Sequence, residues 1–216
     1  MTTTTVYFIR HGRIHNPQKV FYGRHLPMQL SQEGIAEIKE LAHQLKAYKV
    51  HFEAMYTSPL HRAVTTTQTL ADILFVPYEH IYHMDELIDA QIPSLAGKPL
   101  TLREQIHSGG ADEYSGKYLR LGHESRANIV KRMTVALHRV LKNQSGKIVA
   151  LVSHGDSLRF LLFRLLQKRG KIPSMAVLKS IYYPPKGGGW YMVFDEKGNI
   201  LEKKTILEGK ELRIQY

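Results

Sequence analysis

The chain of 216 residues contains no cysteine. This absence excludes a disulfide framework, a thiolate nucleophile, and any zinc or iron–sulfur site held by cysteine. Any catalytic chemistry must therefore come from histidine, carboxylate, hydroxyl and guanidinium groups.

Long apolar runs are also missing. None approaches the roughly 20 residues that a membrane-spanning helix requires, and the opening MTTTTVYFIRHG lacks the charged head and apolar stretch of a signal peptide. We therefore expect a cytoplasmic protein with no membrane partner. No fixed-period repeat, low-complexity segment or linker divides the sequence, which favours a single domain over residues 1–216.

Acidic residues are few. Lys and Arg number 30 against 19 Asp and Glu, so the formal net charge is +11. This balance favours anionic ligands in general. Because the basic residues are scattered, with no basic run, zinc-finger pattern or RNA-binding signature, the sequence disfavours nucleic acid and leaves small phosphate esters as candidate ligands.

Short apolar runs alternate with longer amphipathic stretches, a pattern typical of strands joined by crossover helices. Strands are predicted over 6–9, 52–56 and 148–152, and a hairpin over 190–194 and 200–206. Helices are predicted after the N-cap Ser31, after Ser58-Pro59 with Pro59 in the first turn, and over 125–142 and 157–168. Residues 81–99 read as a strand followed by irregular chain, and 90–124 as an irregular excursion on the substrate side. An α/β layered fold follows.

Two of the predicted strands end in a histidine next to glycine. Arg10-His11-Gly12 follows the first strand and His154-Gly155 follows the strand over 148–152. Ligands of open α/β sheets bind at such strand ends, and glycine there leaves room for a bulky anion. A lone histidine at a strand end is usually structural, but two such ends, with Arg62 in the first turn of a helix, predict an anion site.

The ordered set of motifs resembles the histidine phosphatase superfamily, in its phosphoglycerate mutase-like branch. The motifs are Arg10-His11-Gly12, Asn16, the stretch from Gly23-Arg24 to Gly34, Ser58-Pro59 with Arg62-Ala63, Gly122-His123-Glu124-Ser125, and Ser153-His154-Gly155. The resemblance implies a three-layer αβα sandwich with a mostly parallel central sheet. It also implies that His11 is phosphorylated transiently, that Arg10, Arg62 and His154 surround the phosphoryl group, and that an acidic residue protonates the leaving oxygen.

The chemistry of these residue types supports the same roles. Only a neutral imidazole can attack phosphorus, so His11 must be kept deprotonated, and neighbouring Arg10 and Arg62 disfavour its protonation while matching phosphate oxygens. His154 can donate to an equatorial oxygen, with Gly155 beside it. Asn16 is either a further phosphate donor or a turn-forming residue before Pro17.

Two residues compete for the role of general acid. The family usually has a glutamate eight positions before a glycine, and counting back from Gly97 gives Asp89, whereas Glu86 is the only glutamate nearby. We favour Asp89 and keep Glu86 as the alternative. An aspartate is shorter than a glutamate by one bond, roughly 1.5 Å, so the backbone must compensate.

Other uses of these side chains are disfavoured. The pairs His11/His15 and His80/His83 lie outside the predicted helices and no HExxH motif occurs, so we expect neither a metal nor another cofactor. Without a G-x-S-x-G motif, a serine nucleophile is equally poorly supported. Tyr182-Tyr183 and the stripe 190–194 could line a pocket, but aromatics in alternating strands are usually core.

The sequence therefore predicts a metal-independent phosphatase that hydrolyses phosphomonoesters through a phosphohistidine at His11. Phosphoglycerate mutase-type phosphoryl transfer and a catalytically silent phosphate-binding module are the alternatives. A small phosphorylated metabolite is the preferred partner and a phosphoprotein the second. No motif indicates the substrate or the oligomeric state.

Overall fold

The central sheet holds the elements in place. The computed structural model describes residues 2–167, 181–206 and 208–212, and within them six strands form one sheet in the order β3-β2-β4-β1-β5-β6. The strands are β1 (Thr4–Arg10), β2 (Ala54–Thr57), β3 (Ile81–His83), β4 (Ile148–Ser153), β5 (Gly189–Phe194) and β6 (Ile200–Thr205). The first four pair in parallel, while β5 and β6 add an antiparallel edge. The predicted, mostly parallel sheet and the C-terminal hairpin are confirmed.

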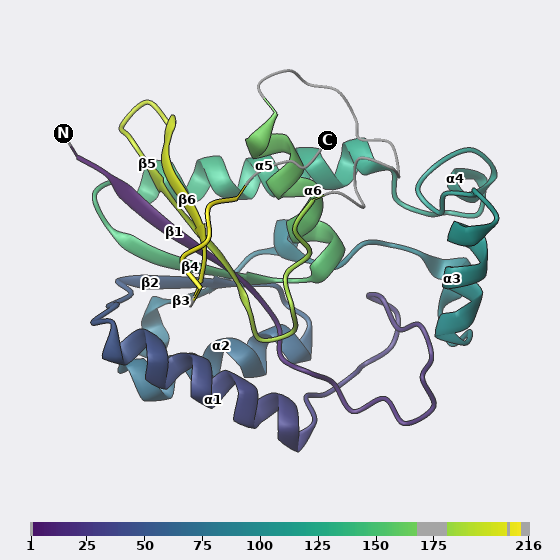
Figure 1. The fold of residues 1–216 in the computed structure, drawn as a ribbon, viewed down its shortest axis with the longest axis horizontal. Coiled ribbons are helices and arrows are strands. Elements are labelled where there is room, and N and C mark those ends of the chain that lie inside the picture. Colours follow the sequence, from purple (N-terminus) through teal and green to yellow (C-terminus); the bar gives the residue numbers. More distant parts are fainter. Residues whose placement is uncertain (1, 168–180, 207, 213–216) are drawn as a thin grey trace.

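Helices cover both faces of this sheet (Figure 1). One face carries α1 (Gln32–Ala47) and α2 (His61–Leu74), and the other α5 (Arg126–Asn143) and α6 (Gly155–Leu166). Because side chains alternate along a strand, Phe8 of β1 packs in the core cluster with α5 and α6, while Ile9 packs in the cluster with α1 and α2. The three-layer αβα sandwich is therefore confirmed.

Two helices begin where their capping residues predict. The hydroxyl of Ser31 accepts a hydrogen bond from the Gly34 amide at 3.1 Å, and that of Ser125 accepts one from the Asn128 amide at 3.1 Å. Each satisfies an amide that the first helical turn leaves unpaired. No helix in the described parts of the chain is long and apolar enough to cross a bilayer.

Two other helices begin elsewhere than predicted. Helix α2 starts at His61, after the N-cap Leu60, so Ser58 and Pro59 precede it, although Arg62 does lie in its first turn. Helix α6 starts at Gly155 rather than Ser157 because His154, its N-cap, already accepts the first helical hydrogen bond from the Leu158 amide at 2.9 Å. This helix ends at Leu166, and the predicted end at Lys168 lies outside the described residues.

The excursion over 90–124 is more ordered than predicted. It contains a 3-10 turn at Pro93–Leu95, α3 (Leu100–Ser108) and α4 (Lys117–Arg120). Two further 3-10 turns, at Tyr78–His80 and Asp85–Leu87, precede it. Leu102 and Ile106, one helical turn apart, pack against the core cluster of α5 and α6. Pro99 before α3 and Gly109 after it are ordinary helix boundary signals, but α3 buries no residue fully, so its periodicity is weak. Figure 1 shows α3 and α4 at one end of the molecule.

The register of the sheet brings distant parts of the sequence together. β1 and β4 pair in parallel with Arg10 opposite Ser153, so the residues that follow, His11 and His154, leave the same edge side by side. The Ser58 amide donates to the Val152 carbonyl at 3.0 Å and thereby joins the start of α2 to that edge. The carboxyl ends of β1, β2 and β4 thus lie side by side at one edge of the sheet, and we call this edge the floor of the site.

Candidate active site

His11 lies at the centre of this floor. Its side chain is buried, and its ring lies 5.2 Å from that of His154 between centroids. The Nδ1 atom is 2.8 Å from the Gly12 carbonyl oxygen. Because a carbonyl only accepts, Nδ1 carries the proton, and the lone pair is on Nε2.

The charge state of His11 follows from its surroundings. Burial lowers the pKa of His11 well below its usual range, and His154, Arg62 and Arg10 lower it further. The Nε atom of Arg62 donates a hydrogen bond to Nε2 of His11 at 3.3 Å. The lone pair on Nε2 therefore faces the Arg62 guanidinium group. His11 is thus a neutral, oriented imidazole at neutral pH.

Arg62 ties the floor together from the first turn of α2. Only 1% of its surface is exposed. One of its Nη atoms donates to the Gly23 carbonyl at 2.7 Å and to the Asp89 carboxylate at 2.9 Å. The guanidinium therefore connects His11, the loop after β1 and Asp89.

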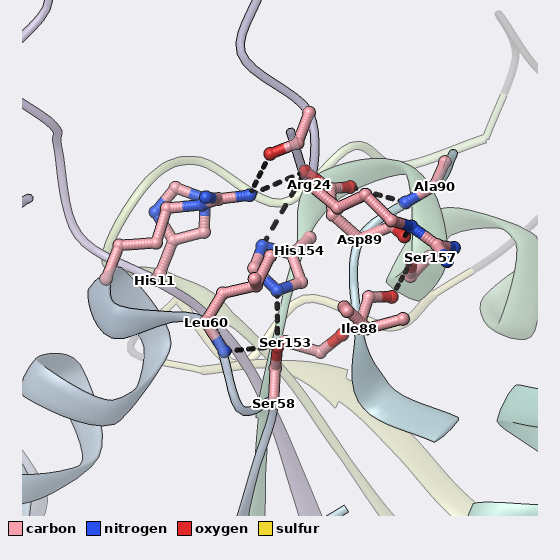
Figure 2. Close-up of polar contacts among 12 residues, drawn as sticks. His11, Arg24, Ser58, Leu60, Ile88, Asp89, Ala90, Ser153, His154 and Ser157 are labelled. Atoms are coloured by element: carbon pink, nitrogen blue, oxygen red, sulfur yellow. Dashed lines mark hydrogen bonds and ion pairs between the residues drawn. The ribbon is translucent and has the colours of Figure 1, made fainter. Parts of the chain in front are cut away.

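His154 points its second nitrogen toward the same carboxylate. Its Nε2 is 2.7 Å from the Ser58 hydroxyl, and its Nδ1 is 3.7 Å from Oδ2 of Asp89 (Figure 2). Burial and then Arg62 lower the pKa of His154 well below its usual range. The Ser58 hydroxyl also accepts a hydrogen bond from the Leu60 amide at 3.3 Å, so it links this ring to the start of α2.

Two donor atoms of the floor have no hydrogen-bond partner in the described part of the chain. They are Nδ1 of His154 and Nε of Arg10, and both are buried. Buried polar atoms are almost always paired, so two orphaned groups beside a neutral imidazole mark a place prepared for an acceptor. Arg10 is itself held by a 3.0 Å hydrogen bond to the Pro184 carbonyl.

The two candidate acids have different surroundings. Asp89 lines the cavity above the floor, and its Oδ1 accepts from the Ala90 amide at 2.9 Å. Glu86 pairs with the half-exposed Arg139 at 2.6 Å and is not among the residues that line the cavity. Of the two carboxyls, only that of Asp89 contacts Arg62.

The cavity itself measures about 200 Å³. Its walls include five residues that the sequence predicts for the site: Arg10, His11, Asn16, Asp89 and Gly155. Arg62 and His154 do not line the cavity. Arg62 contacts His11 and Asp89, and His154 contacts Ser58. The Asn16 amide is engaged on both sides, since it donates to the Val20 carbonyl at 2.8 Å and accepts from the Val20 amide at 3.2 Å.

The glycines of the two motifs serve packing. A Cβ on Gly12 would lie 2.8 Å from the Gly34 carbonyl oxygen of α1, and one on Gly155 would lie 2.3 Å from the Tyr183 hydroxyl. We expected both glycines to make room for a ligand. This expectation is wrong for Gly12, where the absence of a Cβ allows the close approach of α1, and it is incomplete for Gly155.

Sequence reasoning missed several cavity residues. Tyr22, Arg103, Tyr183 and Lys186 all line it. Tyr183 was expected in the core with Trp190, but only Trp190 is buried; the Tyr183 ring lies 4.8 Å from the Arg10 guanidinium carbon and is 38% exposed. Pro99 and Gly109 mark the boundaries of α3, but no signal in the sequence brings Arg103 to the cavity.

We use two names for the charged groups around the cavity. The strand-end cluster comprises Arg10, His11, Arg62, Asp89 and His154, and the Arg103 cluster comprises Arg103, His107, Glu113, Tyr114 and Asp156. In the latter, Arg103 contacts Glu113 at 2.6 Å and Asp156 at 2.5 Å, and His107 contacts Glu113 at 2.5 Å. Although burial opposes it, Arg103 and Tyr114 lower the pKa of Asp156 to about 2.

The strand-end cluster can perform a specific kind of chemistry. A neutral imidazole with its lone pair on Nε2 is a nucleophile, and the guanidinium groups with the orphaned donors can stabilise negative charge on the group attacked. Asp89 brings a carboxyl to the same cluster, 2.9 Å from Arg62 and 3.7 Å from Nδ1 of His154. No three His, Asp or Glu side chains within the described residues are grouped so as to hold a metal ion.

Comparisons with known proteins agree with this geometry. The family model described as histidine phosphatase superfamily (branch 1) matches residues 6–177. A broad-specificity phosphatase of Saccharomyces cerevisiae is 26% identical over 161 residues, which cover 73% of this chain and 68% of the relative. A 2,3-bisphosphoglycerate-dependent phosphoglycerate mutase of Neisseria meningitidis is 30% identical over 185 residues, covering 71% and 81%. Among solved structures, YhfR of Bacillus stearothermophilus shares the fold, with a TM-score of 0.76, 23% identity and coverage of 98% and 100%.

Proposed function

Because the chain belongs to branch 1 of the histidine phosphatase superfamily, we propose that it hydrolyses phosphomonoesters through a phosphohistidine at His11. The observation that carries this proposal is the state of His11: a buried, neutral imidazole whose Nδ1 proton is held by Gly12 and whose Nε2 faces Arg62. The reaction needs no metal, since the guanidinium groups of Arg10 and Arg62 supply the positive charge and His154 supplies a further hydrogen-bond donor.

In the first step, Nε2 of His11 attacks phosphorus. The N–P bond forms while the bond from phosphorus to the ester oxygen breaks, and the Asp89 carboxyl gives its proton to that oxygen. The bound phosphoryl group takes the place of the Asp89 carboxylate on Arg62 and next to Nδ1 of His154. The Asp89 carboxyl that carries the proton then lies beside the phosphoryl group, where it can act as the acid.

In the second step, water attacks the phosphohistidine. The oxygen of the water bonds to phosphorus while Asp89, now a carboxylate, takes a proton from the water. The N–P bond breaks, which restores neutral His11. Arg10, Arg62 and His154 hold the equatorial oxygens in both steps, with Gly155 at the wall and Asn16 at the rim. Since these donors are in place beforehand, they stabilise the transition state without reorganising.

The cavity supports a small phosphorylated metabolite as substrate. At about 200 Å³ it accommodates the phosphoryl group and a short leaving group. Beyond the floor it offers Lys186, and a relative named phosphoglycerate mutase acts on a small anionic ester. Burial, together with Arg10 and Arg13, lowers the pKa of Lys186, so an anionic substituent at this wall would relieve repulsion between cations.

A phosphoglycerate mutase activity is the second candidate, because the mutase relative is 30% identical. It would use the same residues and return the phosphoryl group to a second hydroxyl. Two assays separate the activities: phosphate release from a metabolite panel and from an aryl phosphate, and isomerisation of 3-phosphoglycerate with and without 2,3-bisphosphoglycerate. We expect phosphate release to dominate. Faster isomerisation would establish the mutase, and binding without turnover in either assay would establish a silent phosphate-binding module.

A further inference from the structure

The backbone that carries Asp89 is held by side chains to an unusual degree. All four consecutive carbonyls from Glu86 to Asp89 accept a hydrogen bond from a side chain. Arg132 of α5 accounts for two of them, since its Nη1 donates to the Glu86 carbonyl at 2.7 Å and to the Ile88 carbonyl at 2.6 Å.

Two serines that flank His154 hold the middle of the segment. Ser153 donates to the Leu87 carbonyl at 2.6 Å, and Ser157 donates to the Ile88 carbonyl at 2.9 Å (Figure 2). Both serines are fully buried. The segment before Asp89 is therefore fixed to the same strand end and helix that place His154.

Arg24 completes the arrangement from the loop after β1. Its Nε donates to the Asp89 carbonyl at 2.9 Å, and its Nη2 contacts Glu124 at 2.8 Å. Glu124 also accepts from Nε of Arg132 at 2.8 Å, so a single carboxylate joins the two arginines. Both guanidinium groups are occupied by backbone carbonyls and by this carboxylate, and neither is among the residues that line the cavity.

This arrangement matters because an aspartate carboxyl has little freedom of its own. Two torsions separate it from the backbone, so the position of the backbone decides where the carboxyl can reach. Proton transfer requires a heavy-atom separation of about 2.6–3.2 Å, and a misplacement of about 1 Å can cost on the order of 10²-fold in rate. Holding residues 86–89 thus fixes the proton donor relative to the leaving oxygen.

We propose that Arg132, Glu124 and Arg24 are positioning residues that set the Asp89 carboxyl for proton transfer to the leaving oxygen. The proposal rests on the proposed function, in which Asp89 is the general acid. Arg132 and Arg24 hold the backbone of 86–89, Glu124 joins them, and none of the three lines the cavity.

Leaving-group dependence tests this proposal. The measurement is kcat/KM, which reports the steps up to release of the alcohol, with dinitrophenyl phosphate, whose leaving group needs no proton, and with phenyl phosphate, whose leaving group does. We expect Arg132→Gln to lower kcat/KM about 10-fold or more for phenyl phosphate and less than about twofold for dinitrophenyl phosphate. Arg139→Gln is the matched control: Arg139 lies on the same helix and pairs with the Glu86 side chain, without holding the backbone.

Further variants keep the test decisive. Arg132→Lys retains the charge opposite Glu124 but loses the fork that reaches two carbonyls, so it should show the same selectivity if Arg132→Gln fails to fold. Asp89→Asn should show it more strongly, by roughly 10² to 10⁴-fold on phenyl phosphate. If Asp89→Asn lacks this selectivity, the acid assignment in the proposed function is wrong. If Asp89→Asn shows it but both Arg132 variants match Arg139→Gln, or slow both esters equally, the positioning role is wrong.

Discussion

The strand-end cluster and the Arg103 cluster lie around one cavity and use similar residues in opposite ways. In the Arg103 cluster, the acids Glu113 and Asp156 both contact Arg103, and His107 and Tyr114 complete the pairing. The strand-end cluster holds two arginines but the single carboxylate of Asp89, which pairs with Arg62, and one donor atom each of Arg10 and His154 has no partner among the described residues. The comparison teaches that charged side chains paired with one another indicate a structural role, whereas an excess of oriented donors indicates a site for an anion.

The largest effect should come from His11. We expect His11→Asn to lower kcat/KM by about 10⁴-fold or more, because the nucleophile is lost. The free energy of unfolding should change by less than about 1 kcal/mol, since the asparagine amide can still donate to the Gly12 carbonyl. His15→Asn, at an exposed position four residues on, is the control for both measurements. Activity near that of the unmodified protein would overturn the nucleophile assignment.

Arg62 should come next. Arg62→Lys keeps the charge but loses the planar fork that reaches His11, Gly23 and Asp89, and we expect kcat/KM to fall by roughly 10²-fold. Steady-state kinetics with an aryl phosphate measures the loss, and Arg120→Lys on α4 serves as an exposed control. A loss no larger than in the control would show that Arg62 does not clamp the phosphoryl group.

Glu113 tests the other side of the comparison. Glu113→Gln removes a fully buried charge that contacts Arg103 and His107, and we expect the free energy of unfolding to fall by about 2 kcal/mol. Denaturant unfolding measures this, with kcat/KM expected to change less than about threefold under conditions where the variant is folded. A large loss of activity without a loss of stability would mean that the two clusters do not divide function from structure.

The effect on activity is smallest for the last prediction, which concerns the dependence of stability on pH. The pKa values of His11 and His154 are well below their usual range in the folded protein, so below pH about 6.5 the unfolded chain binds protons that the folded protein does not. The free energy of unfolding should therefore fall on acidification, by up to about 1.4 kcal/mol per pH unit for each histidine.

Denaturant unfolding at several pH values checks this slope. His154→Gln should reduce it, whereas His51→Gln, at an exposed position, should not. Equal slopes in the two variants would contradict a buried, neutral His154.

The same contrast explains which features could be predicted from the sequence. The layered fold, the two strand-end histidines and Arg62 were predictable because short apolar runs define strand ends, and parallel strands deliver their ends to one edge. Arg103 and Lys186 were not, because α3 buries no residue fully and the loop at 184–188 follows no periodic pattern. Their places depend on tertiary contacts such as those of Arg103 with Asp156, which no local pattern encodes.

The general acid was predictable in part. Spacing from Gly97 pointed to Asp89, and the structure brings Asp89 rather than Glu86 to Arg62. The hydrogen bonds that hold residues 86–89 come from three separate parts of the chain, Arg24, Arg132 and the serines beside His154, and could not be anticipated from spacing. The assignment of Asp89 as the acid stays a prediction until its variants are measured.

Trapping of the covalent intermediate tests the central claim most directly. The enzyme is mixed with a ³²P-labelled phosphomonoester, quenched rapidly in alkali, where phosphohistidine survives, and digested for mapping of the label. The account predicts label on Nε2 of His11, formed and lost fast enough to support turnover and absent from His11→Asn. Turnover without label, or label on any other residue, would contradict it.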